Sequence, residues 1–211
     1  MEQYWNSRFL AEGKVWGDSP SKTAVHAGGL FREKRVHTVM VPGAGYGRNT
    51  AFFAASGFRV DGIEMAGEAL RLAGAYDPVT RFFKGSVLDM PFSADIYDAV
   101  YCFNVLHLFG ETNRRLFIGK CRDQLAPRGL AFFTVFSEKE PTFGKGWQSE
   151  PNTFESKPGR PVHYFTHEDL MAHFEGFNML ETGLMEDAEN HGAEGPHVHV
   201  VRYIFAERSD Q

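Results

Sequence analysis

The chain has 211 residues, of which 43% are hydrophobic and 23% are charged, and its formal net charge is −5. This length and composition are typical of one globular domain that buries its own core, and they exclude a disordered chain. A negative net charge without any long Lys/Arg cluster argues against a nucleic-acid partner.

Nothing in the sequence indicates a membrane or a secretory route. No apolar run reaches the roughly 20 residues that a membrane-spanning helix needs. The opening stretch MEQYWNSRFLAEG lacks the basic, apolar and small-residue order of a signal peptide. We therefore predict a cytoplasmic protein, monomeric or homodimeric, that binds no membrane. Cys102 and Cys121 lie apart in apolar stretches, so we expect both to be core residues.

Residues 1–35 have helical, amphipathic spacing, with Trp5, Phe9 and Leu10 on one face and a turn at Gly17–Pro20. We expect this segment to form a helical cover. From residue 36 to residue 136, short apolar runs alternate with helical stretches, which is the pattern of βαβ units. The expected strands are residues 37–41, 58–63, 81–84, 97–102 and 129–136, and the expected helices are residues 47–56, 66–75 and 111–125.

The last third of the chain differs in character. Residues 137–165 are rich in Pro, Gly and polar residues and are expected to form a long loop on the acceptor side. Residues 166–207 predict a helix (166–174) that begins at a Thr cap, then an antiparallel strand pair (178–185 and 197–207). The whole chain therefore predicts one α/β domain over residues 1–211. Its core is a doubly wound, mainly parallel seven-stranded sheet with an antiparallel last strand.

A glycine loop follows the first expected strand of this core. In VMVPGAGYGRN, Gly43, Gly45 and Gly47 come directly after an apolar strand and open a helix. In open α/β sheets this loop is where nucleotide-like cofactors bind. Its GxGxG spacing lacks the third glycine of the dinucleotide motif, and a purely structural turn remains an alternative. Glu64 ends the second strand about 20 positions after the first glycine, where a carboxylate can bind ribose hydroxyls. Asp61 is the weaker candidate for that role.

Two further segments complete an ordered set of motifs. GSVLDMPF (85–92) is followed by YDAVY (97–101) and by NVLHL (104–108). Over residues 36–136 this order resembles the class I S-adenosylmethionine-dependent methyltransferases, whose fold is Rossmann-like. The resemblance implies that S-adenosylmethionine is the cofactor and S-adenosylhomocysteine the product. It implies cofactor contacts by Gly43, Gly45, Tyr46, Gly47, Glu64, Ser86, Val87 and Asn104. Ser86 stands where the family usually has an Asp that contacts adenine.

The acceptor side is expected to come from both ends of the chain. The N-terminal segment resembles that of the tellurite-resistance and related small-molecule methyltransferases, and this implies that Tyr4, Trp5, Arg8 and Trp16 close the acceptor pocket. A hydrophobic helix that merely covers the sheet is the alternative. Arg160, His163, His197 and His199 are further candidates from the long loop and the last strand.

His197 and His199 alternate on a strand and therefore face one side together. Without an Asp, Glu or Cys at a clear companion spacing, we predict no metal site, and a hydrogen-bonded surface pair remains possible. His107, His163 and His197 are the candidate catalytic bases, although a core role for His107 is equally open.

The predicted reaction is in-line transfer of a methyl group from S-adenosylmethionine to a small-molecule acceptor. An oxygen or nitrogen acceptor needs a base, whereas a soft sulfur or metalloid nucleophile needs none. The alternatives are a nicotinamide-dependent oxidoreductase and a non-catalytic module that only binds S-adenosylmethionine.

Overall fold

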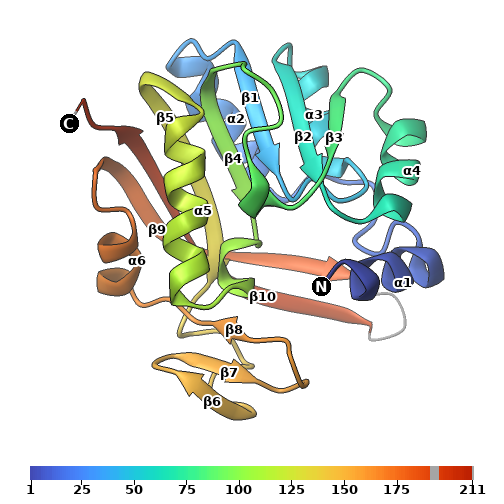
Figure 1. Cartoon of the computed structure of the whole chain (residues 1–211), viewed down its shortest axis with the longest axis vertical. Coiled ribbons are helices and arrows are strands. Elements are labelled where there is room, and N and C mark those ends of the chain that lie inside the picture. The colour runs from blue at the N-terminus through green and yellow to red at the C-terminus, as the bar shows by residue number, and fades with distance from the viewer. Residues whose placement is uncertain (191–194, 211) are drawn as a thin grey trace.

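The computed structural model describes residues 1–190 and 195–210 of the chain. Its centre is a seven-stranded sheet with the strand order β3-β2-β1-β4-β5-β10-β9 (Figure 1). Neighbouring strands from β3 to β5 run parallel, while β10 is antiparallel to both β5 and β9. The predicted doubly wound, Rossmann-like sheet is confirmed. The strands are β1 Thr38–Pro42, β2 Arg59–Glu64, β3 Arg81–Lys84, β4 Tyr97–Phe103, β5 Leu125–Phe136, β9 Phe177–Asn190 and β10 Pro196–Arg208.

Helices cover both faces of this sheet. On one face, α2 (Lys22–Glu33) and α3 (Arg48–Ala55) pack on the strands, and on the other face lie α5 (Glu111–Asp123) and α6 (His167–His173). A further helix, α4 (Gly67–Tyr76), connects β2 to β3, and short 3₁₀ turns occupy Val87–Asp89 and Leu106–Leu108. No helix in the described ranges is long and apolar enough to cross a bilayer.

The central strands are buried on both faces, as expected for a sheet that helices cover twice. On β4, Val100 and Cys102 join the core under α5, while Tyr101 joins the core under α2 and α3. Successive side chains of a strand point to opposite faces, so one strand supplies both cores. Cys102 and Cys121 are buried and unpaired, in agreement with the predicted core role.

The N-terminal segment divides into two helices with different surroundings. The second, α2, begins at Ser21, whose hydroxyl accepts a hydrogen bond from the Ala24 amide, and it belongs to the layers of the main fold. The first, α1 (Glu2–Glu12), lies at the edge of the sheet near α4 (Figure 1). It packs through Phe9 on a small cluster that includes Tyr46 of the glycine loop.

Where a long loop was expected over residues 137–165, the structure has a small antiparallel sheet below the main one (Figure 1). Its strands are β6 Trp147–Glu150, β7 Thr153–Glu155 and β8 Val162–His163. Strands of two to four residues with mostly polar side chains carry no readable alternation, which is why the sequence pattern did not predict them.

Candidate active site

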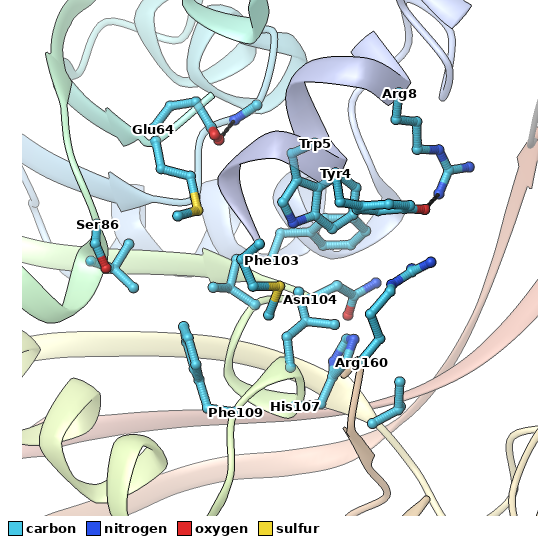
Figure 2. A pocket seen from close by; sticks show the side chains of 18 of the residues that line it. Tyr4, Trp5, Arg8, Glu64, Ser86, Phe103, Asn104, His107, Phe109 and Arg160 are labelled. Atoms are coloured by element: carbon cyan, nitrogen blue, oxygen red, sulfur yellow. Dashed lines mark hydrogen bonds between the residues drawn. The ribbon is translucent and has the colours of Figure 1, made fainter. Parts of the chain in front are cut away.

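A cavity of about 680 Å³ opens at the carboxyl ends of β1, β2 and β4. This is the edge at which open α/β sheets bind ligands, and the volume is that of a small-molecule site. Most of the predicted site residues line it, from elements spread over the whole chain (Figure 2). They are Tyr4, Trp5, Arg8, Trp16, Gly43, Gly45, Tyr46, Glu64, Ser86, Val87, Asn104, His107, Arg160 and His199. Gly47, His163 and His197 are not part of the lining.

The glycine loop forms the floor of the cavity. Gly43 has a φ of 71°, and a Cβ built on it would lie 2.3 Å from Cγ2 of Val105. The amides of Gly43 and Ala44 both donate to the carbonyl of Ile63, at 2.8 and 2.9 Å. The loop is therefore held against the end of β2 in a conformation that favours glycine. Gly47 is the last glycine of the same loop and forms the N-terminal cap of α3.

Glu64 fixes the same loop from the second strand. One carboxylate oxygen accepts from the Gly45 amide at 2.9 Å, and the other accepts from the Ala66 amide at 2.8 Å. The side chain is nearly buried, and burial raises its pKa although these amide donors act in the opposite direction. Glu64 thus lies at the tip of β2 and lines the cavity, and its contact with a ribose stays a prediction.

Ser86 and Asn104 are positioned by local hydrogen bonds. The Ser86 hydroxyl accepts from the Leu88 amide at 3.2 Å and caps the 3₁₀ turn that follows β3. Asn104 has a φ of 53° after β4, and its side-chain oxygen accepts from the Thr134 hydroxyl at 3.0 Å. Met65 also lines the cavity and was not predicted, because a methionine after a strand carries no distinctive signal.

His107 lines the cavity but is otherwise enclosed. Its Nδ1 accepts from the Phe136 amide at 3.3 Å, and its ring stacks on that of Phe136 with centroids 4.1 Å apart. Burial lowers its pKa to about 3. The ring is therefore neutral near pH 7, and with Nδ1 accepting, the proton is assigned to Nε2. This environment favours a hydrogen-bond donor over a base.

Aromatic side chains from the N-terminus form one wall. Phe9 and Trp16 contact Tyr46, with the Trp16 ring stacked on that of Tyr46 at 6.1 Å, and Trp5 packs against Phe9 and Trp16. The Tyr46 hydroxyl donates to the Gly17 carbonyl at 2.6 Å. The predicted N-terminal segment therefore lies directly on the glycine loop.

Several cationic side chains also line the cavity. Arg160, from the turn between β7 and β8, places its guanidinium carbon 3.6 Å from the centroid of the Tyr4 ring (Figure 2). The small sheet and α1, far apart in the chain, meet through this contact. Arg8, Arg48 and Lys157 also line the cavity, whereas Glu64 is the one acidic side chain among its described lining residues. Arg48 was not predicted, since it is a helix residue whose guanidinium reaches back over Phe103.

His163 lies outside the cavity, because its ring is turned toward α6. Its Nδ1 pairs with the Thr153 hydroxyl at 2.8 Å, and its Nε2 pairs with the Asp169 carboxylate at 2.5 Å. Burial lowers its pKa, and Asp169 opposes that shift in part. These contacts attach the small sheet to α6. A histidine on the acceptor-side segment was predicted to be catalytic, but the direction of its ring could not be known from the sequence.

His197 and His199 lie side by side on β10, as the alternation predicted, with ring centroids 4.6 Å apart. Glu140 meets them: its Oε1 lies 2.8 Å from His199 Nδ1, and its Oε2 accepts from the Val200 amide at 2.8 Å. Burial raises the pKa of Glu140, but these hydrogen bonds outweigh burial and leave it below its ordinary value. Glu140 was not predicted, because it lies far from the two histidines along the chain.

Comparisons with known proteins agree with this arrangement. A family model described as a methyltransferase domain matches residues 39–129, and among curated proteins none matches the sequence. The structure resembles 1,6-didemethyltoxoflavin-N1-methyltransferase of Burkholderia thailandensis, with a TM-score of 0.72 at 20% identity, over 99% of this chain and 87% of that chain.

Two other solved enzymes cover the chain about as fully. Magnesium protoporphyrin IX methyltransferase of Synechocystis has a TM-score of 0.73 at 17% identity, over 99% of this chain and 97% of that chain. The N-methyltransferase NodS of Bradyrhizobium japonicum has a TM-score of 0.69 at 15% identity, over 98% and 97%. At such identities the likeness establishes the fold. The methyltransferase-domain match over residues 39–129 agrees with the predicted resemblance to the class I S-adenosylmethionine-dependent methyltransferases.

Proposed function

We propose that this protein methylates a small, apolar acceptor that carries an anionic group, and that the acceptor binds in the outer part of the cavity beside α1. The observation that carries the proposal is the charge pattern of the lining. Arg8, Arg48, Lys157 and Arg160 line the cavity together with several aromatic rings, and Glu64 is the one acidic side chain among the described lining residues. An excess of cations beside aromatic rings suits a carboxylate or phosphate on an apolar body.

The glycine-loop end fits the methyl donor. Gly43 and Gly45 line the cavity directly after β1, and Glu64 provides carboxylate oxygens at the tip of β2. When bound there, S-adenosylmethionine supplies a sulfonium methyl that is already activated for displacement. In this proposal Gly43, Gly45 and Tyr46 surround the methionine moiety, Glu64 binds the ribose, and Ser86 with Val87 contacts the adenine.

The protein groups near the acceptor align it and exclude water, with little acid–base chemistry of their own. His107 is a weak base because of its low pKa, and its Nε2–H is suited to donate to an acceptor oxygen. Neither His163 nor His197 lines the cavity. The proposal therefore favours a nucleophile that is already deprotonated or soft at neutral pH, so that transfer needs positioning more than proton removal.

Calorimetric titration of the purified protein with S-adenosylmethionine and S-adenosylhomocysteine tests the donor end. Glu64→Ala removes the buried acceptor, and we expect binding to weaken by about 1–3 kcal/mol, the cost of unmade hydrogen bonds in a buried site. Glu33→Ala makes the same change at an exposed position of α2 and is the matched control. Thermal unfolding of each variant separates lost binding from lost fold.

An acceptor screen follows, with pairs of compounds that differ in one carboxylate or phosphate. Faster methylation of the anionic member of each pair is the expected result. Equal rates for charged and neutral members would remove the anionic-acceptor proposal while leaving the donor site intact. If the wild type binds NAD(H) and neither S-adenosyl compound, the nicotinamide alternative replaces the whole proposal. Donor binding without turnover across the screen would instead favour the non-catalytic module.

A further inference from the structure

A three-residue cluster at the junction of β5 and β10 lies outside the proposed chemistry. The turn after β5 brings Glu140 back beside β10: the Ser137 amide donates to the Val200 carbonyl at 3.2 Å, and the Glu140 amide donates to the Ser137 carbonyl at 3.0 Å. His197 and His199 alternate on β10 and share the face that Glu140 approaches. The fold thus joins one carboxylate and two imidazoles that the sequence keeps far apart.

The geometry of the cluster is that of a ligand set. One donor atom from each of Glu140, His197 and His199 lies within 4.8 Å of the other two. Oε1 of Glu140 is 2.8 Å from His199 Nδ1 and 3.6 Å from His197 Nε2. The Glu140 side chain is fully buried and that of His199 is 8% exposed, but His197 is 39% exposed, so an ion can enter from its side.

The charged groups around Glu140 are compatible with a bound cation. In the described ranges, both ion-pair partners of the buried Glu140 carboxylate are histidines, and neither is a Lys or Arg. A cation held between the three ligand atoms would add a positive charge next to this buried carboxylate, which favours its ionised form. The ligands are also supported from behind, since Val200 donates to Oε2 of Glu140 and the ring of Phe136 stacks on His199 at 4.7 Å. Such outer contacts hold metal ligands in place.

We infer that Glu140, His197 and His199 bind a divalent transition-metal ion at the wall of the cavity, where His199 contributes to the lining. Two imidazoles and one carboxylate are a set that zinc and its neighbours accept, whereas magnesium and calcium prefer all-oxygen sites. Three protein ligands leave a further coordination position for water or another oxygen ligand. The inference corrects the assumption behind the prediction of no metal site, namely that the histidines lack a companion carboxylate.

The test is metal binding itself, measured on tag-free, chelator-treated protein without any methyl donor or acceptor. We expect calorimetry to show one Zn²⁺ per chain and Co²⁺ to give the visible absorption of a site with nitrogen ligands. His197→Ala and Glu140→Gln should each weaken Zn²⁺ binding by at least about tenfold. His37→Ala, at an exposed histidine before β1, is the matched control and should bind as the wild type does.

Two results would overturn the inference. One is a wild type that binds neither Zn²⁺ nor Co²⁺ at the level of one ion per chain. The other is a His197→Ala protein that binds both ions as well as the His37→Ala control does, which would leave the cluster a hydrogen-bonded triad only. Because His197 is partly exposed, this variant stays informative even if Glu140→Gln fails to fold. Neither result depends on the proposed methyl acceptor, so the two proposals can fail separately.

Discussion

The two ends of the cavity are built in opposite ways. The glycine-loop end comes from neighbouring strands of one sheet, and its contacts are hydrogen bonds donated by backbone amides such as those of Gly43 and Gly45. The other end, where we propose that the acceptor binds, is assembled from α1, the turn between β7 and β8, and β10, and its contacts are side-chain contacts such as that of Arg160 with Tyr4. We expect the glycine-loop end to tolerate few substitutions. Substitutions at the other end can change which acceptor binds without loss of the fold.

The largest expected effect lies at the glycine-loop end, at Gly43. In Gly43→Ala the new methyl would meet Val105 at 2.3 Å and require a φ of 71°. Overpacking and left-handed strain together cost about 2–5 kcal/mol, which should abolish measurable S-adenosylmethionine binding and lower the unfolding midpoint. Calorimetry and denaturant unfolding measure the two losses.

Gly29→Ala provides the control for that comparison. Gly29 lies within α2 with no atom within 4 Å of an added Cβ, so the same substitution should stabilise the helix by up to about 1 kcal/mol. Comparable donor affinity in the Gly43→Ala and Gly29→Ala proteins would show that the loop does not need its close approach to Val105.

A second, smaller effect is expected at His107, which also lines the cavity. Its pKa is about 3 in the folded protein and 6.5 in the unfolded chain, so below pH 6.5 the unfolded state binds the extra proton. The protonation of His107 therefore leaves the free energy of unfolding unchanged above pH 6.5. Below that pH, the free energy of unfolding falls by about 1.4 kcal/mol per pH unit toward pH 3. Urea unfolding at several pH values should show this slope in the wild type and a shallower one in His107→Gln.

The same pair of proteins tests the role of His107 in transfer. We expect the rate of methylation in the wild type to show no inflection near pH 6.5, because the His107 ring is neutral on both sides of that pH. A rate that falls below pH 6.5 in the wild type and becomes flat in His107→Gln would identify the ring as a base after all.

The smallest effect is expected at the acceptor end, at Arg160. Arg160→Met removes the cation over Tyr4 and one positive group from the cavity, which is worth about 0.5–2 kcal/mol. The KM for the acceptor should rise about twofold to thirtyfold, while the dissociation constant for S-adenosylmethionine stays unchanged. Lys145→Met, at an exposed position outside the lining, should change neither constant. A loss of donor affinity in Arg160→Met would mean that the two ends are not separable.

The sequence predicted the fold and the positions of the glycine loop and Glu64 well, for identifiable reasons. Short apolar runs separated by helical stretches predicted each strand of the main sheet to within a few residues. Strands that are buried on both faces consist largely of apolar residues, which makes such runs easy to recognise. Glu64 was found by its spacing from Gly43, since both positions are fixed by one short βαβ unit. The small sheet over residues 147–163 was not predicted, because its strands are short and largely polar.

What the sequence alone determined is therefore local: the strands, the glycine loop and the acidic strand tip, each encoded within a few dozen residues. The tertiary structure determined the features that depend on contacts between distant segments. The ring of His163 faces Asp169, the ring of His107 is buried against Phe136, and Glu140 lies beside the histidines of β10. Packing between segments sets the direction of a side chain and the charged groups that lie next to it. The spacing of residues along the sequence does not encode this packing.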